Sequence, residues 1–114
     1  MIAPLAARWP TFDFVVHAIG YTNKEALRGH YADVTVEDFL MTMNISVYSF
    51  TAVAKRAAAM MTPFDPETGN GGGSLLTLSY YGAEKVIPHY NVMGVAKSAL
   101  ETSVKYLAND YGPQ

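Results

Sequence analysis

The sequence predicts an α/β fold built around a parallel sheet, and three observations indicate it. Residues 12–19 and residues 74–80 are short apolar runs suited to strands. Residues 36–61 and residues 90–110 carry apolar side chains at helical spacing, so the predicted order is β-α-β-α. A strand, a crossover helix and a second strand form the right-handed unit of a parallel sheet. Ligands of such sheets bind outside the carboxyl ends of the strands.

The first predicted elements lead into the sheet. Residues 1–9 are typical of the last turns of a helix, and Pro10 closes it. Residues 12–19 form a compact, mainly apolar run, as expected of a parallel strand buried on both faces, and Gly20 ends it. Residues 21–34 are polar and irregular, which predicts a loop over the carboxyl edge of the sheet.

The two helices are separated by a flexible connection. Thr35, followed by Asp38 three residues later, approximates a capping box and marks the start of the long helix 36–61. Apolar residues on two sides of this helix imply a partner beyond the sheet. Residues 62–73 are rich in Pro and Gly and are expected to form a loop. A Gly-Pro pair stops the second helix, residues 90–110.

Composition limits the classes of function. Charged residues are 16% of the chain, against about 25% in typical soluble domains, which indicates the inside of a larger assembly. A net charge of −2 without a basic cluster argues against a nucleic acid or an anionic membrane as partner. The absence of Cys excludes thiolate metal sites, and the three His have no ligand-like spacing, so we predict no metal.

Targeting signals are not evident in the sequence. No long apolar core with a small-residue cleavage site marks a signal peptide. Nowhere do eighteen apolar residues run together, so no membrane span is expected. The expected location is the cytoplasm.

Residues 79–97 connect the second strand to the second helix and carry the candidate chemistry. Tyr90 and Lys97 stand seven residues apart, which places them within about 20° of one helix face. The Lys side chain leans toward the helix N-terminus and so toward the phenol. A nearby ammonium favours the phenolate, so we expect a lowered Tyr90 pKa and a hydroxyl that can protonate or hydrogen-bond an oxyanion.

The context of this pair is more specific than its spacing. Residues 76–97 are Leu-Thr-Leu-Ser-Tyr-Tyr-Gly-Ala-Glu-Lys-Val-Ile-Pro-His-Tyr-Asn-Val-Met-Gly-Val-Ala-Lys. This segment closely resembles the active-site segment of the enoyl-acyl carrier protein reductases, the divergent short-chain dehydrogenases whose signature is Tyr-x6-Lys. The resemblance continues to Gly112 and includes residues 17–21, so it covers nearly the whole chain from about Phe12 onward.

Two other pairs are rejected because spacing alone is weak evidence. Tyr48 and Lys55 share the offset but lie in mid-helix without a preceding strand, so we interpret them as surface or interface residues. Tyr81 and Lys85 have the Tyr-x3-Lys offset of classical short-chain dehydrogenases, but Gly82 interrupts the helix that would align them. A classical carbonyl reductase is therefore disfavoured.

The resemblance implies a Rossmann-like, doubly wound parallel sheet, of which residues 1–114 would hold only a β-α-β-α portion. Family members begin with a glycine-rich turn that binds dinucleotide phosphates and end with further strands and a substrate lid, and we expect this chain to lack both. Residues 69–73 cannot replace that turn, because a phosphate-binding loop opens a helix whereas this run precedes a strand. Residues 64–72 also make this region longer than in family members.

The resemblance further implies an oxidoreductase of fatty acid biosynthesis. It would reduce a trans-2-enoyl thioester on acyl carrier protein with NADH, NADPH not being excluded. Tyr90, Lys97 and Tyr80 would be the catalytic residues: Tyr90 would donate to the enolate, Lys97 would also hold the nicotinamide ribose, and Tyr80 would face the substrate.

Other matched positions imply contacts with cofactor or substrate. Ile19, Gly20 and Ser79 would lie along the cofactor together with Lys97, and Gly20 would allow close approach of the backbone. Thr22 and Met93 would line the acyl pocket with Tyr80, although Met93 also suits a core position. The mid-helix Asn44 is not selected as a site residue.

Two hypotheses remain open for the chain. The first is a reductase, seen here in its central part, that forms a homotetramer through its two long helices when complete and is inactive as the isolated segment. The second is a catalytically silent fragment or paralogue that keeps the helices for association and binds no cofactor.

Overall fold

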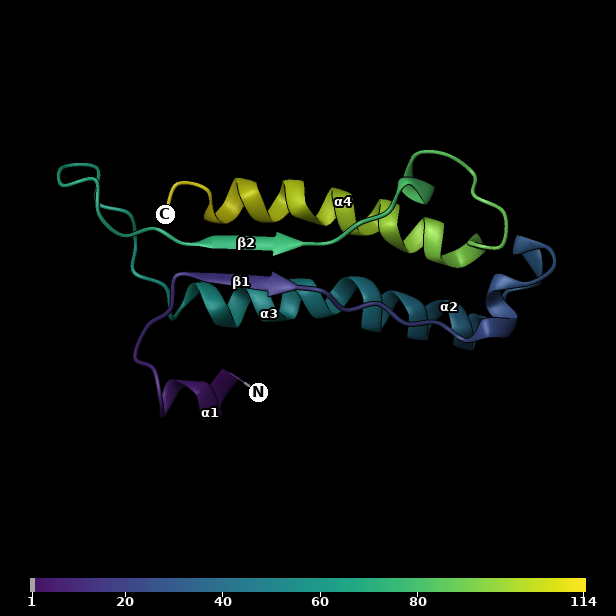
Figure 1. Ribbon diagram of the computed structural model, residues 1–114, viewed down its shortest axis with the longest axis horizontal. Coiled ribbons are helices and arrows are strands. Elements are labelled where there is room, and N and C mark those ends of the chain that lie inside the picture. The colour runs from purple at the N-terminus through teal and green to yellow at the C-terminus, as the bar shows by residue number, and fades with distance from the viewer. Residues whose placement is uncertain (1) are drawn as a thin grey trace.

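The computed structural model describes residues 2–114 and shows a β-α-β unit with a long helix after it and a short helix before it (Figure 1). The main elements in chain order are α1 (Ile2–Ala6), β1 (Phe14–His17), α2 (Val36–Met43), η3 (Asn44–Tyr48), α3 (Ser49–Ala58), β2 (Ser74–Thr77) and α4 (Asn91–Tyr111). Short 3₁₀ turns occupy Lys24–Leu27, Tyr31–Asp33 and Tyr81–Ala83. The predicted order is confirmed, and Met1, part of the predicted first helix, lies outside the described residues.

The two strands pair in parallel, with Phe14 opposite Ser74 and His17 opposite Thr77. Both are shorter than the predicted runs 12–19 and 74–80. The pairing ends where the two segments that follow β1 and β2 separate and lead into different loops (Figure 1). Their carboxyl ends nevertheless point toward the same end of the molecule, as a parallel sheet requires.

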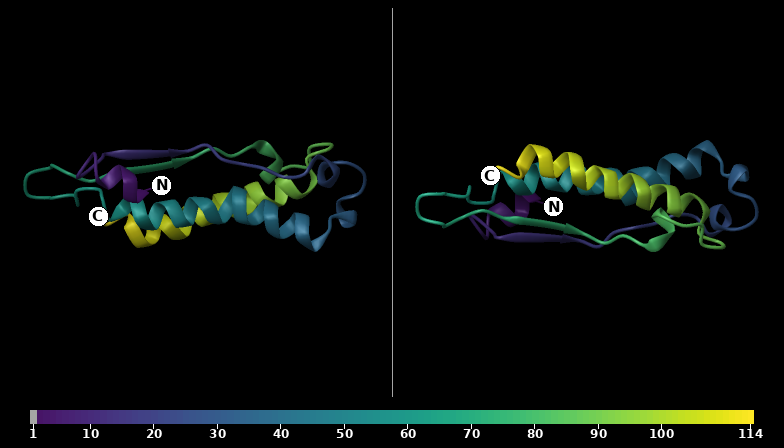
Figure 2. Two further views of the ribbon diagram at one scale, coloured as in Figure 1. Left: turned by 90° about the horizontal axis from the view of Figure 1, so that it is seen from below. Right: turned by 90° about the horizontal axis from the view of Figure 1, so that it is seen from above.

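Helices cover only one face of this sheet in the described residues (Figure 2). On the other face Phe14 is 66% exposed and Val16 is 53% exposed. The prediction of a first strand buried on both faces is therefore wrong for residues 2–114, because no second helical layer lies over these side chains.

The molecule is elongated rather than spherical. Its dimensions are 54 × 29 × 17 Å, and its radius of gyration is 16.6 Å, against about 13 Å for a compact domain of this length. This shape leaves apolar surface uncovered, as the low charged content predicts. Among the described helices, none is both long and apolar enough to cross a bilayer.

The first long helix is interrupted by a wider turn. The Thr35 hydroxyl accepts a hydrogen bond from the Asp38 backbone N–H at 3.1 Å, which confirms the predicted cap. The α2 helix then passes into the π-helical turn η3 before α3 continues to Ala58, short of the predicted end at Met61. Nothing in the sequence predicted the π turn, since no Pro or Gly lies within α2, η3 or α3.

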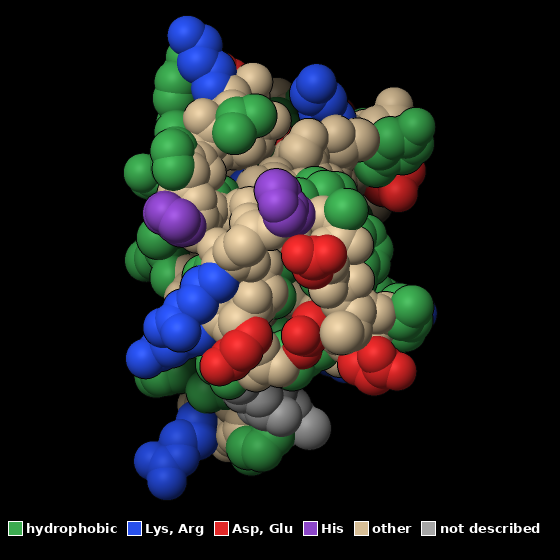
Figure 3. Space-filling model, turned by 90° about the vertical axis from the view of Figure 1, so that its right-hand side faces the viewer, with side chains coloured by type: hydrophobic (Ala, Val, Ile, Leu, Met, Phe, Trp, Pro, Cys, Tyr) green, Lys and Arg blue, Asp and Glu red, His purple; other side chains and the backbone are tan. Residues whose placement is uncertain are grey.

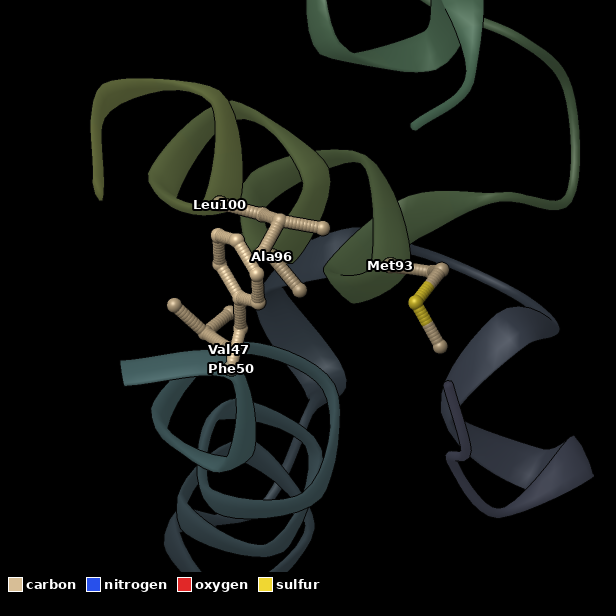
Figure 4. Close-up of a cluster of buried hydrophobic side chains, with 5 residues drawn as sticks. All are labelled: Val47, Phe50, Met93, Ala96 and Leu100. Atoms are coloured by element: carbon tan, nitrogen blue, oxygen red, sulfur yellow. The ribbon is translucent and has the colours of Figure 1, made fainter. Parts of the chain in front are cut away.

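The hydrophobic core lies where η3 and α3 cross α4 (Figure 4). Its buried members are Val47, Phe50, Met93, Ala96 and Leu100. Ala96 is small enough to let the Phe50 ring lie close to α4, and Leu100 packs beside it (Figure 4). Packing of these helices positions the N-terminal half of α4 at the carboxyl ends of the strands.

Replacing Phe50 by Ala is expected to destabilise the protein by about 3 to 5 kcal/mol, because it removes a buried ring and leaves a cavity. Urea unfolding would measure the loss. The exposed Val36 serves as control, and Val36→Ala should change stability by less than about 0.5 kcal/mol. Equal losses in the two variants would contradict this assignment of the core.

The connection 62–73 is an ordered loop at the amino ends of the strands. An isolated antiparallel bridge joins Asp65 to Asn70 and closes it. Gly71 has a positive φ of 80°, and a Cβ there would collide with the Pro63 carbonyl oxygen. Glycine is therefore required at this position. The loop lies at the opposite end of the strands from the predicted site (Figure 1).

Candidate active site

The candidate site lies at the carboxyl ends of β1 and β2, beside the first turns of α4. Figure 3 looks onto this end of the molecule, where acidic, basic, histidine and apolar side chains are interspersed. Open α/β sheets bind their ligands at this edge. The location therefore agrees with the prediction made from residues 79–97.

Lys97 links three parts of the site. Its ammonium Nζ donates a hydrogen bond to the Leu78 carbonyl at 3.1 Å, just beyond the end of β2. A Cβ added to Gly20 would lie 3.7 Å from the same Nζ, so the loop after β1 passes close to it. Burial lowers the pKa of Lys97. The Lys97 side chain, which extends from α4, thus places a positive charge between the carboxyl ends of the two strands.

Tyr90 and Tyr80 face one another in the same region. Their ring centroids lie 4.9 Å apart with the planes tilted by 52°. Tyr80 is 51% exposed at the end of β2, whereas Tyr90, just before α4, is half-buried. The structure therefore brings both predicted tyrosines together, one reachable from solvent and one fixed in position.

The pKa of Tyr90 moves opposite to the prediction. Burial raises it, and the neighbouring Tyr80 raises it further. The predicted lowering by the Lys97 ammonium is wrong, because desolvation of the phenol is the largest effect and the Lys97 ammonium bonds to the Leu78 carbonyl instead. The phenol is therefore protonated at neutral pH and acts as a hydrogen-bond donor.

Two glycines allow the turn Tyr81–Ala83 to pack against Tyr90. A Cβ added to Gly82 would lie 2.5 Å from Cδ2 and 2.9 Å from Cε2 of the Tyr90 ring. A Cβ added to Gly94 would lie 2.9 Å from the Gly82 carbonyl oxygen. From the sequence, Gly82 was predicted only to break a helix. Its larger effect is to leave room for the Tyr90 ring.

The predicted cofactor contacts are arranged along the strand ends. Gly20 lies beside the Lys97 ammonium. Ile19 and Ser79, which follow β1 and β2, are both exposed. These side chains and backbone atoms are accessible at the same edge of the sheet.

The predicted acyl-pocket residues differ in their surroundings. The Thr22 hydroxyl forms a 2.6 Å hydrogen bond with the Thr42 hydroxyl, so it is already committed to α2. Met93 is 8% exposed and belongs to the hydrophobic core, so little of its surface faces outward. The rejected tyrosines differ again: Tyr48 is exposed, and Tyr81 lies under the Lys85 ammonium, with 5.8 Å between Nζ and the ring centroid.

A buried histidine that the sequence analysis did not select supports this end of the sheet. His17 is almost fully buried, and its Nδ1 lies 2.9 Å from the Thr77 hydroxyl while its Nε2 lies 2.8 Å from the Ser49 hydroxyl. Burial lowers its pKa. The imidazole joins β1, β2 and α3. A histidine that ends an apolar run was the signal in the sequence. No group of three metal-ligating side chains occurs within residues 2–114.

Comparison with known proteins identifies the family. A family model described as enoyl-(acyl carrier protein) reductase matches residues 1–114. The chain belongs to this family. The NADH enoyl-acyl carrier protein reductase 1 of Rhizobium meliloti is 57% identical over 112 residues, which are 98% of this chain and 38% of that protein. The chain therefore spans about two fifths of the length of the curated reductases it matches.

Solved reductase structures confirm the predicted Rossmann-like fold class. The enoyl-acyl carrier protein reductase of Anaplasma phagocytophilum, in complex with NAD, is 55% identical with a TM-score of 0.89, covering 98% of this chain and 40% of that one. The Bacillus cereus reductase, with NADP+ and indole naphthyridinone, is 45% identical with a TM-score of 0.88, covering 97% and 40%. Residues 2–114 thus correspond to part of the larger α/β fold of these relatives.

Proposed function

We propose that this segment belongs to an NADH-dependent enoyl-acyl carrier protein reductase, which reduces trans-2-enoyl thioesters in fatty acid biosynthesis. The observation that carries the proposal is the placement of Tyr80, Tyr90 and the Lys97 ammonium together at the carboxyl ends of two parallel strands. The names of the similar reductases support the cofactor and the substrate class. NADPH stays open as a cofactor, since one similar reductase was solved with NADP+.

The residues present fit a nicotinamide dinucleotide. An ammonium has three N–H donors, and the Leu78 carbonyl takes one of those of Lys97. The others can bond to ribose hydroxyls. Gly20 lies beside this ammonium without a side chain, so a ligand can approach the backbone closely. When bound, the cofactor supplies the hydride that goes to the β-carbon of the thioester.

The tyrosines supply the complementary chemistry. The protonated Tyr90 hydroxyl can donate to the thioester oxygen as negative charge develops on it, which stabilises the transition state more than the ground state. Its raised pKa keeps the proton on the phenol across the neutral range. The exposed Tyr80 contacts the substrate from the strand end, and the Lys97 charge keeps the site positive.

The test is a chimera in which this segment replaces the matching residues of the Rhizobium meliloti reductase. We expect it to oxidise NADH with a trans-2-enoyl acyl carrier protein thioester, while the unmodified reductase serves as control. A chimera that folds and binds NADH without turnover would overturn the proposal. It would favour the catalytically silent paralogue instead.

Gly82→Ala in this chimera should lower kcat/KM by about tenfold to 10²-fold, because the new methyl displaces the Tyr90 ring from its reacting position. The measurement is steady-state NADH oxidation. Ala83→Ser, a similarly small change in the same turn, serves as control and should change little. Full activity of the Gly82 variant would show that the ring has room to move.

Assembly is the remaining part of the proposal. A hollow of about 1020 Å³ runs along α4 beneath residues 82–87, and one of its lining residues, the aromatic Tyr106, is 73% exposed. Exposed apolar surface of this kind marks interfaces. We infer that the complete enzyme is a homotetramer packed through its long helices. Residues 1–114 would be part of one Rossmann-like domain, and the cytoplasm remains the proposed location.

Tyr106→Glu should dissociate the chimera into smaller species, because a buried unpaired charge is costly at an interface. Sedimentation would measure the species present. Lys105→Glu, at the neighbouring exposed position outside the hollow, serves as a charge control. A tetramer that persists in Tyr106→Glu would place the interface elsewhere.

A further inference from the structure

Three consecutive residues of the loop after β1 are hydrogen-bonded to three helical residues spaced four apart. We call this set the loop ladder. Its pairs are Tyr21 with Ser46, Thr22 with Thr42, and Asn23 with Asp38. The loop runs antiparallel to the helix, so each step along the loop meets the preceding turn of α2 and η3.

The rung at Ser46 holds the backbone of a single loop residue. The Ser46 hydroxyl accepts from the Tyr21 N–H at 3.0 Å and donates to the Tyr21 carbonyl at 3.2 Å. Ser46 is 0% exposed. Removing this buried hydroxyl takes away both bonds at once, and the Tyr21 N–H and carbonyl lose their partner on the helix.

The rung at Thr42 has a defined direction. The Thr42 hydroxyl donates to the Asp38 carbonyl at 2.6 Å, so the Thr22 hydroxyl must be the donor in the 2.6 Å bond to Thr42. Thr42 is also 0% exposed. The last rung is at the half-buried end of the ladder, where the Asn23 amide donates to the Asp38 carboxylate.

The π turn keeps the rungs in line. In a regular α-helix, residues four apart drift by about 40° around the axis at each step. The wider turn at Asn44–Tyr48, with i→i+5 hydrogen bonding, turns less per residue and counteracts that drift before Ser46. Ser46 can therefore face the same loop as Thr42 and Asp38.

The ladder ends beside the candidate site. A Cβ added to Gly20 would lie 3.9 Å from the Ser46 hydroxyl and 3.7 Å from the Lys97 ammonium. The first rung is thus one residue away from the backbone that passes Lys97. Whatever fixes Tyr21 also fixes the approach of Gly20 to the charge.

We propose that Asp38, Thr42 and Ser46 are positioning residues that hold loop 20–23 in the conformation that receives the cofactor and the acyl substrate. This inference rests on the proposed reductase function. A loop ordered before binding spares the ligand the entropy of ordering it, so the ladder acts on affinity more than on the chemical step. None of the three residues was predicted from the sequence as a site residue, and Asp38 was identified only as part of the helix cap.

The kinetic test uses Thr42→Val in the chimera, which keeps the shape and removes the acceptor of the Thr22 hydroxyl. We expect the Kd of NADH and the KM of the enoyl thioester to rise about tenfold, with a smaller change in kcat. Thr42→Ser restores the hydroxyl and should restore both constants. Unfolding curves of each variant check that it is folded before its constants are compared with those of the parent chimera. Unchanged Kd and KM in folded Thr42→Val would overturn the proposal.

The outer rung provides a matched pair of variants. Asp38→Ala removes the acceptor of Asn23, whereas Glu37→Ala removes the same charge from the same helical turn without touching the ladder. Only Asp38→Ala should raise the Kd of NADH. If Thr42→Val does not fold, this half-buried position still decides the question, and equal constants in the two Ala variants would overturn the proposal.

Hydrogen exchange separates this inference from the proposed function. In Ser46→Ala the Tyr21 amide loses its acceptor, and its exchange should accelerate by about tenfold or more relative to the amides of the core helix α4. This readout needs no turnover. If the chimera is inactive but its Tyr21 amide is protected and exchanges faster in Ser46→Ala, the reductase function is refuted and the role of the loop ladder stands. If the chimera is active but Ser46→Ala leaves exchange at Tyr21 unchanged, the role of the loop ladder is refuted.

Discussion

Tyr90→Phe in the chimera is expected to lower kcat by about 10² to 10³, with little change in the Kd of NADH. The substitution removes the hydroxyl that we propose as donor to the developing charge, and it keeps the ring that packs on Tyr80 and Gly82. An interaction made only in the transition state affects kcat and kcat/KM together. Stopped-flow oxidation of NADH with a trans-2-enoyl thioester measures kcat, and fluorescence titration measures the Kd of NADH.

Two further tyrosine variants make this result specific. Tyr81→Phe alters the neighbouring exposed tyrosine, whose ring lies under Lys85, and should behave as the parent. Tyr80→Phe should lower kcat less than Tyr90→Phe does. If Tyr90→Phe turned over at the parent rate while Tyr80→Phe was inactive, Tyr80 would be the donor and the roles would be reversed.

Lys97→Ala is expected to weaken NADH binding and slow turnover together, because in the proposed function the ammonium bonds to the cofactor in the ground state and also keeps the site positive. The loss of one charge-assisted hydrogen bond corresponds to about 1.5 to 3 kcal/mol, or more than tenfold in Kd. Lys97→Arg should retain part of both functions because the charge survives. Normal NADH binding by Lys97→Ala would remove any cofactor role for this residue.

The same residue should set the alkaline limit of activity. Burial lowers the Lys97 pKa, so its charge is lost as the pH rises, at a lower pH than for an ordinary lysine. Burial raises the Tyr90 pKa, so the donor keeps its proton over that range. Activity should therefore fall at alkaline pH in the parent chimera. Lys97→Arg should shift the fall to higher pH, because guanidinium does not deprotonate there.

The sequence was sufficient for the order of elements because each depends on local pattern. The Thr35 cap and the apolar spacing along the two long helices placed them within a few residues. The π turn at Asn44–Tyr48 could not be foreseen, since no Pro or Gly marks it and the residue that it brings to the loop after β1, Ser46, lies 25 positions from its partner Tyr21. The open face of the sheet at Phe14 likewise depends on what lies above it.

The site was predictable only in part for similar reasons. Helical spacing put Tyr90 and Lys97 on one face, and the resemblance selected them among several tyrosine and lysine pairs. The sign of the Tyr90 pKa shift depended on burial, which spacing does not report. The loop ladder joins residues such as Tyr21 and Ser46 that lie 25 positions apart, so no short motif contains it.

Loop 62–73 is a suitable insertion site for a label or a tag. The Gly72 N–H bonds to the Thr62 carbonyl at 2.7 Å, which closes the loop at its base, and its tip projects away from the carboxyl ends of the strands (Figure 1). Lengthening such a tip adds only about 0.6 kcal/mol of closure entropy for each doubling of its length. A fluorophore or affinity tag inserted between Glu67 and Thr68 would therefore leave β2 in register and report on the molecule without entering its chemistry.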